Sequence, residues 1–496
     1  MTNPFKKYGR VLQFCLLGAI ALAITFMTAT CSTVPQGVDL KPSSASLSRQ
    51  IMESEDLESA DDVVQIWWSQ GFLPEENEVI SNIVADWEAE SGYQANLTLL
   101  PDSAIIQDIQ NAINEERAPD VFFSFAADTN LIPQLAWNGE LADISDVIQL
   151  HQNDYSETAL QSVFYQNQAT RTRSYYALPF GQNTIHLHYW KNYLEEAGFT
   201  PDNIPTQWDA FWQFWQGAQD RLRSEGNTSI YGLGLCLSNL GTDTFWPFEQ
   251  FLEAYNVEVV DPNGQLQLDS DEARAGIAAV IDQFAQFYTE GYVPPAATTW
   301  TDSGNNFSFL EGQVLMTANS TLSIPFTQRQ PETPYNQMSN ELYFDKIHTV
   351  PWPQKPDGET VQAVLSIKQL AIIDQSELSD VRTEAAKSFL EYFSRQDVVD
   401  QYLQTATKGR IFPVIPALFS KPFWNKPDDP HSSVALAQYQ GNARPSYQVF
   451  APAYSQVLQD NVWANAILRV IEEDVTPEQA ADEAIAQIKS IFAEWL

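Results

Sequence analysis

The run "VVQIWW" at residues 63–68 begins a regular alternation of apolar strands and amphipathic helices. "NEVISNIVADWEAESG" (77–92) and "SAIIQDIQNAINEERA" (103–118) have apolar residues at helical spacing. "YQANLTLL" (93–100) and "DVFFSF" (120–125) fit strands. The order β-α-β-α-β predicts an α/β fold whose sheet is parallel and joined by right-handed crossovers.

The composition limits the classes of function that the chain can have. The chain has 496 residues with 44% hydrophobic content, enough for two or three packed domains. Its net charge is −38, which repels nucleic acid and anionic headgroups. We therefore expect no nucleic-acid partner and a soluble, monomeric globular part.

The N-terminus has the form of an export signal at residues 1–30. Lys6, Lys7 and Arg10 precede a nearly continuous apolar stretch, and "TATC" ends at Cys31. This pattern predicts lipidation of Cys31 in a lipoprotein anchored at the outer face of the cytoplasmic membrane or in the periplasm. An uncleaved anchor and ordinary secretion remain the alternatives. Residues 31–61 lack aromatic side chains and read as a flexible tether.

A second alternation follows Gly181. "IHLHYW" (185–190) fits a strand, and "TQWDAFWQFWQGAQDRLRSEG" (206–226) predicts a helix capped by Thr206 whose Trp and Phe stripe faces a core. "VEVVDPNGQLQL" (257–268) predicts a hairpin with an Asn-Gly turn. "SDEARAGIAAVIDQFAQFYTEG" (270–291) predicts a helix capped by Ser and Asp.

Several segments together resemble one family. They are "APDVFFS" (118–124), "YALPFGQNTIHLHYWKNYLEEAGF" (176–199), "IPTQWDAF" (204–211), "FLEGQVLMTANST" (309–321), "VPWPQKPDG" (350–358), "EAAKSFLEYF" (384–393) and "GRIFPV" (409–414). Their order is similar to that of the extracellular solute-binding proteins of carbohydrate ABC transporters (family 1), which include maltose- and multiple-sugar-binding proteins. The chain departs from the pattern at Trp190, where Asn is usual, and at Gln207, which interrupts a Thr-Trp pair.

The resemblance implies a two-lobe periplasmic-binding-protein-like fold. Each lobe would be a mostly parallel sheet flanked by helices, with a hinge between the lobes. The expected division is lobe I at 62–177, lobe II at 178–352, a return segment of lobe I at 353–394, and a C-terminal helical part at 395–496 that packs mainly on lobe II. Residues 177–181 would form the first crossover.

The resemblance also implies a function. The chain would be the membrane-tethered substrate-binding component of a carbohydrate ABC importer, with no enzymatic activity and no cofactor. It would capture a neutral sugar or polyol between the lobes and deliver it to the ABC permease. A sugar needs amide, hydroxyl and carboxyl partners together with flat aromatic faces. The candidate contacts are Trp68, Ser69, Gln70, Phe125, Gln182, Asn183, Asp243, Trp246, Asn305, Asn319, Arg410 and Tyr447.

Other readings stay open. His186 and His188 share one strand face, but no third ligand is indicated by spacing, so we expect no metal. "TDSGNNF" (301–307) lacks the spacing of a calcium loop. Cys236 lies in an apolar run typical of a small buried thiol. The rival functions are an exported glycoside hydrolase and a solute-sensing binding protein.

Overall fold

The computed structural model describes residues 62–329, 340–375 and 380–495. The predicted signal peptide (1–30), Cys31 and the tether (31–61) lie outside the described residues. No helix of the described part is long and apolar enough to cross a membrane.

The first sheet begins with the alternation that the sequence predicts. It runs through β1 (Val64–Ser69), α1 (Pro74–Ser91), β2 (Ala95–Leu100), α2 (Asp102–Asn114) and β3 (Val121–Phe123). β1 pairs in parallel with both β2 and β3. The predicted β-α-β-α-β unit and its parallel pairing are confirmed.

Distant segments complete the first sheet. They are β6 (Leu178–Asn183), β11 (Ala363–Ile372), β12 (Phe412–Pro413) and β13 (Ala443–Pro445). The strand order is β12-β6-β11-β3-β1-β2, and β13 pairs with β11. β11 is antiparallel to β3 and β6. Five separate parts of the described chain therefore meet in one sheet: the β1–β3 unit and these four strands.

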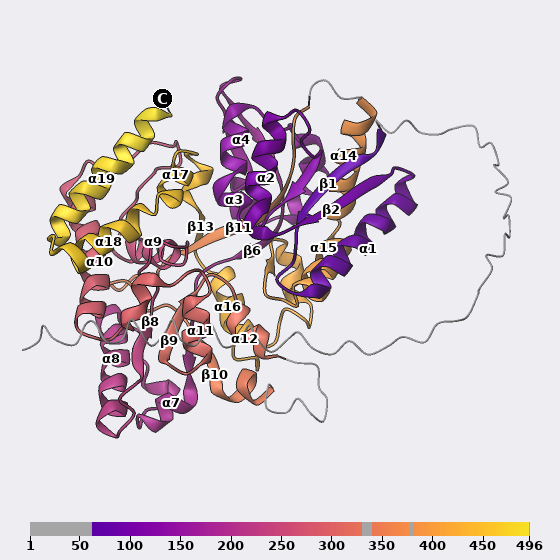
Figure 1. Cartoon of the computed structure of the whole chain (residues 1–496). Coiled ribbons are helices and arrows are strands. Elements are labelled where there is room, and N and C mark those ends of the chain that lie inside the picture. The colour runs from indigo at the N-terminus through magenta and orange to yellow at the C-terminus, as the bar shows by residue number, and fades with distance from the viewer. Residues whose placement is uncertain (1–61, 330–339, 376–379, 496) are drawn as a thin grey trace, which may run out of the picture. The chain divides into compact units, whose positions relative to one another are not determined.

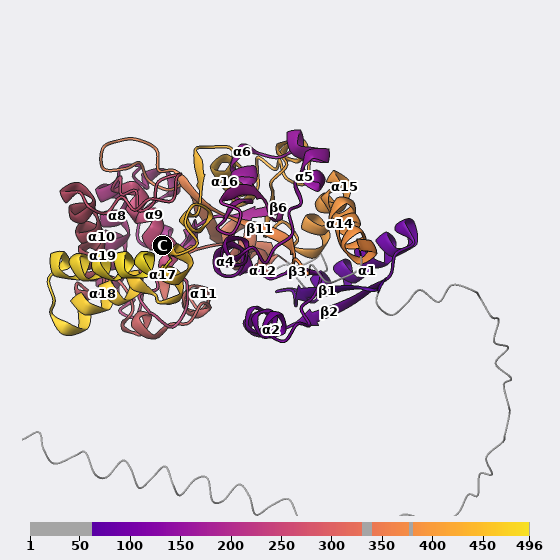
Figure 2. The same cartoon turned by 90° about the horizontal axis from the view of Figure 1, so that it is seen from above.

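Helices cover both faces of the first sheet. α1 and α14 (Asp380–Ser394) pack with Ile66 and Trp68 in one core cluster, whereas α2 and α4 (Ile132–Asn138) pack with Phe122 in another. Figure 2 shows the two helix groups on either side of β1 and β2. The remaining short elements are α3 (Ala127–Asn130), α5 (Ser145–His151), α6 (Glu157–Gln161), β4 (Phe164–Asn167) and β5 (Thr172–Tyr175).

The second sheet has the order β10-β7-β9-β8. Its strands are β7 (His186–Trp190), β8 (Tyr231–Gly234), β9 (Val314–Asn319) and β10 (Ile347–Val350). β8 and β9 are parallel, but β7 is antiparallel to β9 and to β10. The expectation of a mostly parallel sheet is therefore wrong here. β7 follows directly from β6 of the first sheet, and its partners β9 and β10 come from later, separate parts of the chain.

A large core lies around the second sheet. α8 (Trp208–Ser224) places its whole Trp and Phe stripe in it, as predicted. Thr206 does not cap α8, because the N-cap is Gln207. Ser270 does cap α10 (Asp271–Thr289) by accepting from the Ala273 amide. The predicted hairpin is reduced to a turn and one bridge, Val260↔Leu266. Other helices of this part are α7 (Lys191–Glu196), α9 (Phe245–Ala254), α11 (Gly304–Leu310) and α12 (Ser323–Gln328).

The C-terminal part divides between the two cores. α17 (Tyr454–Gln459), α18 (Val462–Glu473) and α19 (Pro477–Glu494) pack around the second sheet, beside α10 (Figure 1). In contrast, α15 (Gln396–Gln401), the π-helical turn Tyr402–Ala406, and α16 (Ser432–Tyr439) contribute to the first core. The expectation that residues from 395 onward pack mainly on lobe II is thus wrong up to Tyr439, because their apolar side chains meet α1 and β6 instead.

Candidate ligand-binding site

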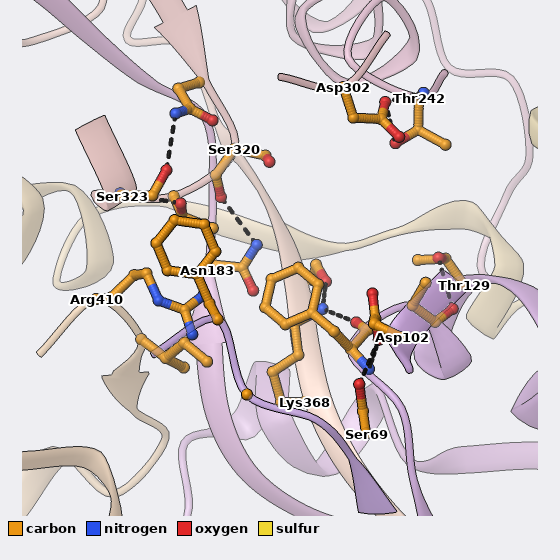
Figure 3. A pocket seen from close by; sticks show the side chains of 18 of the residues that line it. Ser69, Asp102, Thr129, Asn183, Thr242, Asp302, Ser320, Ser323, Lys368 and Arg410 are labelled. Carbon is orange, nitrogen blue, oxygen red and sulfur yellow. Dashed lines mark hydrogen bonds between the residues drawn. The ribbon is translucent and has the colours of Figure 1, made fainter. Parts of the chain in front are cut away.

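A cavity of about 490 Å³ lies between the ends of strands from both sheets. Its first wall is formed by residues of the first sheet and nearby segments, and Figure 3 shows several of them around Lys368. These residues are Ser69, Gln70, Gly71, Phe72, Glu76, Asp102, Phe123, Phe125, Ala126, Thr129, Asn130, Asn183, Ser366, Lys368, Tyr402, Arg410 and Ile411. Its second wall consists of Thr242, Asp243, Trp246, Asp302, Asn306, Asn319, Ser320, Thr321, Ser323 and Leu458.

Most of the predicted contacts line this cavity. Parallel strands β1 and β3 end at the same edge, so the residues that follow them meet there. The predicted residues that line it are Ser69, Gln70, Phe125, Asn183, Asp243, Trp246, Asn319 and Arg410. Their position is consistent with the predicted binding role, which stays a prediction for each residue.

Trp68 does not reach the cavity. Its side chain is 1% exposed and packs against Phe123, Phe393 and Tyr402, with ring centroids 4.8, 5.7 and 5.8 Å away. The predicted stacking face is therefore wrong for Trp68. The helices that cover this face of the sheet bury it in the core.

Gln182 also lies outside the cavity lining. Neighbouring side chains of a strand point to opposite faces, so only one of Gln182 and Asn183 can face the second wall. The amide of Gln182 donates to the Pro413 carbonyl oxygen at 2.8 Å, across the pairing of β6 with β12. Its predicted role as a contact is replaced by a bond inside the first sheet.

Asn305 and Tyr447, two further predicted contacts, do not line this cavity either. The Asn305 amide donates to the Ala318 carbonyl oxygen at 2.9 Å, and its neighbour Asn306 lines the cavity instead. The Tyr447 hydroxyl accepts from the Val259 amide at 3.2 Å. Tyr447 lines a separate cavity of about 420 Å³ beside Arg444. Both residues support the structure around the second core.

Two cations and two aromatic rings alternate along the first wall. The Lys368 ammonium lies 3.9 Å from the ring centroid of Phe125. The Arg410 guanidinium lies 5.7 Å from Phe125 and 5.0 Å from Phe72. Both cations therefore form cation–π contacts with Phe125, an aromatic residue that the sequence analysis predicted to contact the ligand. Phe72, which is 55% exposed, and the half-buried Trp246 leave more aromatic surface for a ligand.

Arg410 and Lys368 are both buried and paired. Arg410 donates to a Glu76 carboxylate oxygen at 2.8 Å. Lys368 donates to Asp128 at 3.1 Å, to the Ser366 hydroxyl at 2.8 Å and to the Phe125 carbonyl oxygen at 2.6 Å. Burial lowers the pKa of Lys368, although Asp128 opposes this change. The two ion pairs hold the first wall in one arrangement.

The second wall carries carboxyl groups. Asp302 accepts from the amides of Thr242 and Asp243, the latter at 3.1 Å. Burial, and then the neighbouring Asp302, raise the pKa of Asp243 well above its usual range. Asn319 donates to Asn306 at 2.9 Å and to the Ser323 hydroxyl at 3.1 Å. Figure 3 shows Asp302 and Thr242 apart from the group around Lys368.

Four buried polar atoms of cavity-lining residues have no hydrogen-bond partner in the described part of the chain. They are the side-chain oxygens Asn130 Oδ1, Asn183 Oδ1 and Asp243 Oδ2, and the nitrogen Arg410 Nε. Buried polar groups are nearly always paired, and an unpaired one costs about 1–3 kcal/mol. The cavity therefore offers donors and acceptors that suit a ligand rich in hydroxyl groups.

Sequence reasoning missed several lining residues. Asp102 opens α2 directly after β2, where a strand-end argument would have found it. Lys368 is a charged residue within the buried run "AVLSIKQLAI", which is itself a signal of a functional or paired charge. Asp302 lies in the segment 301–307, in which the sequence analysis named Asn305 as a ligand contact and not Asp302. Nothing in the sequence indicated that Phe72 and Glu76 line the cavity, except that both follow β1 closely.

The histidines of β7 make hydrogen bonds within the core. His186 bonds to Gln438 at 3.0 Å and to Tyr439 at 3.2 Å, and His188 bonds to the Thr349 hydroxyl at 2.9 Å. The described residues contain no group of three or more His, Cys, Asp or Glu side chains placed to hold a metal ion. Cys236 is buried as expected, and burial raises the pKa of its thiol to about 11.

A comparison with protein families finds one that covers most of the chain. The family model of the bacterial extracellular solute-binding proteins matches residues 82–431, which is most of the chain. No curated protein sequence matches the chain significantly.

Solved structures share the fold at low sequence identity. A Thermotoga lettingae ABC transporter solute-binding protein bound with α-D-tagatose is 19% identical over 87% of this chain and 99% of its own, with a TM-score of 0.67. Maltose-bound MalE3 of T. maritima is 20% identical over 86% and 100%, with a TM-score of 0.64. A sugar transporter from Arthrobacter chlorophenolicus with bound laminaribiose is 15% identical over 86% and 99%, with a TM-score of 0.65. The expected two-lobe α/β fold is confirmed.

Proposed function

The chain belongs to the bacterial extracellular solute-binding proteins, and on that premise we propose that it is the membrane-tethered substrate-binding component of a carbohydrate ABC importer. It captures a neutral sugar or polyol in the cavity between the two sheets and delivers it to the permease. The sugars bound by structures of the same fold, α-D-tagatose, maltose and laminaribiose, support this ligand class.

The observation that carries the proposal is the set of unpartnered polar atoms in one cavity. Asn183 from the first wall and Asp243 from the second each leave an oxygen unpaired, and Arg410 leaves a nitrogen unpaired. A sugar hydroxyl both donates and accepts, so one polyol can serve all of these atoms. Phe72 and Trp246 add aromatic faces for the C–H surface of a sugar ring.

The membrane tether is part of the proposal. Lipidation of Cys31 would hold the protein at the outer face of the cytoplasmic membrane, and residues 32–61 would let the binding part move near the permease. The support is the basic and apolar N-terminal sequence that ends at Cys31.

A ligand screen tests the proposal. The chain from residue 62 onward is purified, and its thermal stability is measured with mono-, di- and oligosaccharides, including amino sugars. Binding shifts the midpoint because the ligand stabilises only the folded state. Hits are titrated by calorimetry, and we expect a 1:1 complex.

The rival functions predict different outcomes. Chromatography of the recovered ligand should show the sugar unchanged, whereas an exported glycoside hydrolase would release products. Deletion of the gene should abolish uptake of the sugar, whereas a solute sensor would leave uptake intact. Failure of every sugar to bind refutes the proposed function.

A further inference from the structure

The charges around the cavity do not balance. Among the described residues that line the cavity, the cationic side chains are those of Lys368 and Arg410, and both lie on the first wall. No described Lys, Arg or His lines the second wall. Carboxyl groups line both walls. The balance between these groups decides which ligand charge the cavity accepts.

Both cations are already neutralised. An ammonium group has three N–H donors, and Lys368 directs them to Asp128, Ser366 and the Phe125 carbonyl oxygen. Arg410 forms a buried ion pair with Glu76 at 2.8 Å, and both side chains are almost completely buried. Neither cation therefore has a charge left to attract an anionic ligand.

Three carboxyl groups remain without a cationic partner. Asp102, Asp243 and Asp302 line the cavity, and none of them forms an ion pair with another described residue. Asp102 accepts from the Ser69 hydroxyl at 2.6 Å, and Asp302 accepts from backbone amides. These hydrogen bonds stabilise the carboxylates; Asp102 in addition lies close enough to Lys368 to raise the pKa of that ammonium, whereas Asp302 has no cation beside it among the described lining residues.

Asp243 adds an independent observation. Its side chain is 9% exposed, it lines the cavity, and its Oδ2 has no partner in the described part of the chain. Its backbone amide lies 3.1 Å from Asp302 Oδ1, so the two acidic residues are close. Burial, and then the neighbouring Asp302, raise the pKa of Asp243, whereas a hydrogen bond with Asn305 and any positive charge beside the carboxyl group lower it.

We infer that the preferred ligand is an amino sugar, whose protonated amino group binds at Asp243 and Asp302 on the second wall. The inference rests on the proposed function as a sugar-binding component and changes the expected ligand from a neutral to a positively charged sugar. An ammonium group supplies three donors to acidic acceptors and replaces the missing positive charge. The net charge of −38 also attracts a cationic ligand toward the protein.

Binding of the amino group is coupled to loss of a proton. The ammonium favours the ionised form of Asp243, so the fraction of the carboxyl group that is protonated before binding releases its proton to solvent as the ligand binds. Affinity should therefore rise with pH until the amine of the ligand loses its own proton. The titratable and charged groups around Asp243 are Cys236 and Asp302 near it, and Glu76, Asp102, Lys368 and Arg410 on the first wall.

Matched sugars test the inference. Calorimetry at pH 6.5 compares glucosamine, galactosamine and a β-1,4-linked glucosamine dimer with glucose, galactose and cellobiose, and with the N-acetylated forms. In any set that binds, the amino member should bind at least tenfold more tightly than its hydroxyl and N-acetyl counterparts. Titration at pH 4, where a raised pKa leaves Asp243 largely protonated, in two buffers of different ionisation heat should show proton release only for the amino member.

Each outcome has a separate meaning. Equal or tighter binding of the hydroxyl counterparts overturns the inference and leaves the proposed function standing. Absence of binding by every sugar, charged or neutral, overturns the proposed function and the inference with it. Tighter binding of the amino sugar without proton release places the ammonium elsewhere and overturns the assignment to Asp243.

A pair of variants locates the charge effect. Asp243→Asn keeps the size of the side chain and removes the carboxyl group, so the tenfold preference and the proton release should both disappear. Asp428→Asn is the same substitution at an exposed position outside the cavity lining and should keep both. A preserved preference in Asp243→Asn contradicts the inference.

Discussion

Two neighbouring amides on β6 allow a sharp test of the cavity. The Asn183 amide donates to the Ser320 carbonyl oxygen at 2.9 Å, and the Gln182 amide donates to the Pro413 carbonyl oxygen at 2.8 Å. Both side chains are 3% exposed. Only Asn183 lines the cavity, where its Oδ1 is unpartnered. Gln182→Ala is therefore a matched control for Asn183→Ala.

The expected magnitudes follow from these contacts. Each truncation removes one buried hydrogen bond and leaves a carbonyl group unpaired, so each should lower the free energy of unfolding by about 1–3 kcal/mol. Asn183→Ala also leaves a ligand hydroxyl without its acceptor, which costs about the same amount again. Since 1.4 kcal/mol is tenfold in affinity, binding should weaken on the order of tenfold to a hundredfold.

The assay separates folding from binding. Urea denaturation gives the free energy of unfolding, and calorimetry gives the affinity of each folded variant for the tightest sugar of the screen. We expect similar destabilisation in both variants but weaker binding in Asn183→Ala alone. Binding by Asn183→Ala within threefold of wild type, or an equal loss in Gln182→Ala, would refute the assignment of the cavity.

Three further predictions concern the cores and the anchor. Trp68→Ala should destabilise the fold by about 3–5 kcal/mol, measured by urea denaturation, because the indole fills a buried aromatic cluster; a loss below 1 kcal/mol would contradict this packing. Burial lowers the pKa of His186 to about 3, below its unfolded value, so its contribution to stability is complete above pH 6.5 and is lost as pH falls toward 3. A His186→Gln variant should show a flatter dependence of unfolding free energy on pH in that window, and an unchanged slope would contradict the assignment. Cys31→Ser should release the protein from membranes, and mass spectrometry that finds an intact Met1 or an unmodified Cys31 in the wild-type protein would refute lipidation.

The strongest sequence signals predicted local structure well. The Trp and Phe stripe of α8 and the alternation through β1, β2 and β3 were readable because each repeats over several turns or strands. The sequence did not predict which strands pair in the second sheet or in which direction they run. The direction of β7 depends on where the chain crosses from the first sheet, and periodicity along a strand carries no information about its partner.

The sequence predicted which residues lie near the site, but not which side chains they contact. Strand ends identified Ser69, Gln70 and Phe125 because the topology gathers such residues at one edge. Neighbouring residues Trp67 and Trp68 point to opposite faces of β1, but helices cover both faces of the sheet. Two of the rings that bury Trp68 come from Phe393 and Tyr402, far along the chain. Contacts between segments so distant in the sequence cannot be read from either segment alone.

The passage from β6 to β7 has a mechanical consequence. The Thr184 hydroxyl donates to the Val364 carbonyl oxygen at 2.8 Å, and the Ile185 carbonyl oxygen accepts from Trp352 at 2.9 Å and from Gln438 at 3.0 Å. One short connection is thus bonded to three other segments at the same place. A single strand would allow the two sheets to twist freely about it. Here a twist would have to strain or break these bonds, so the connection resists torsion between the two sheets.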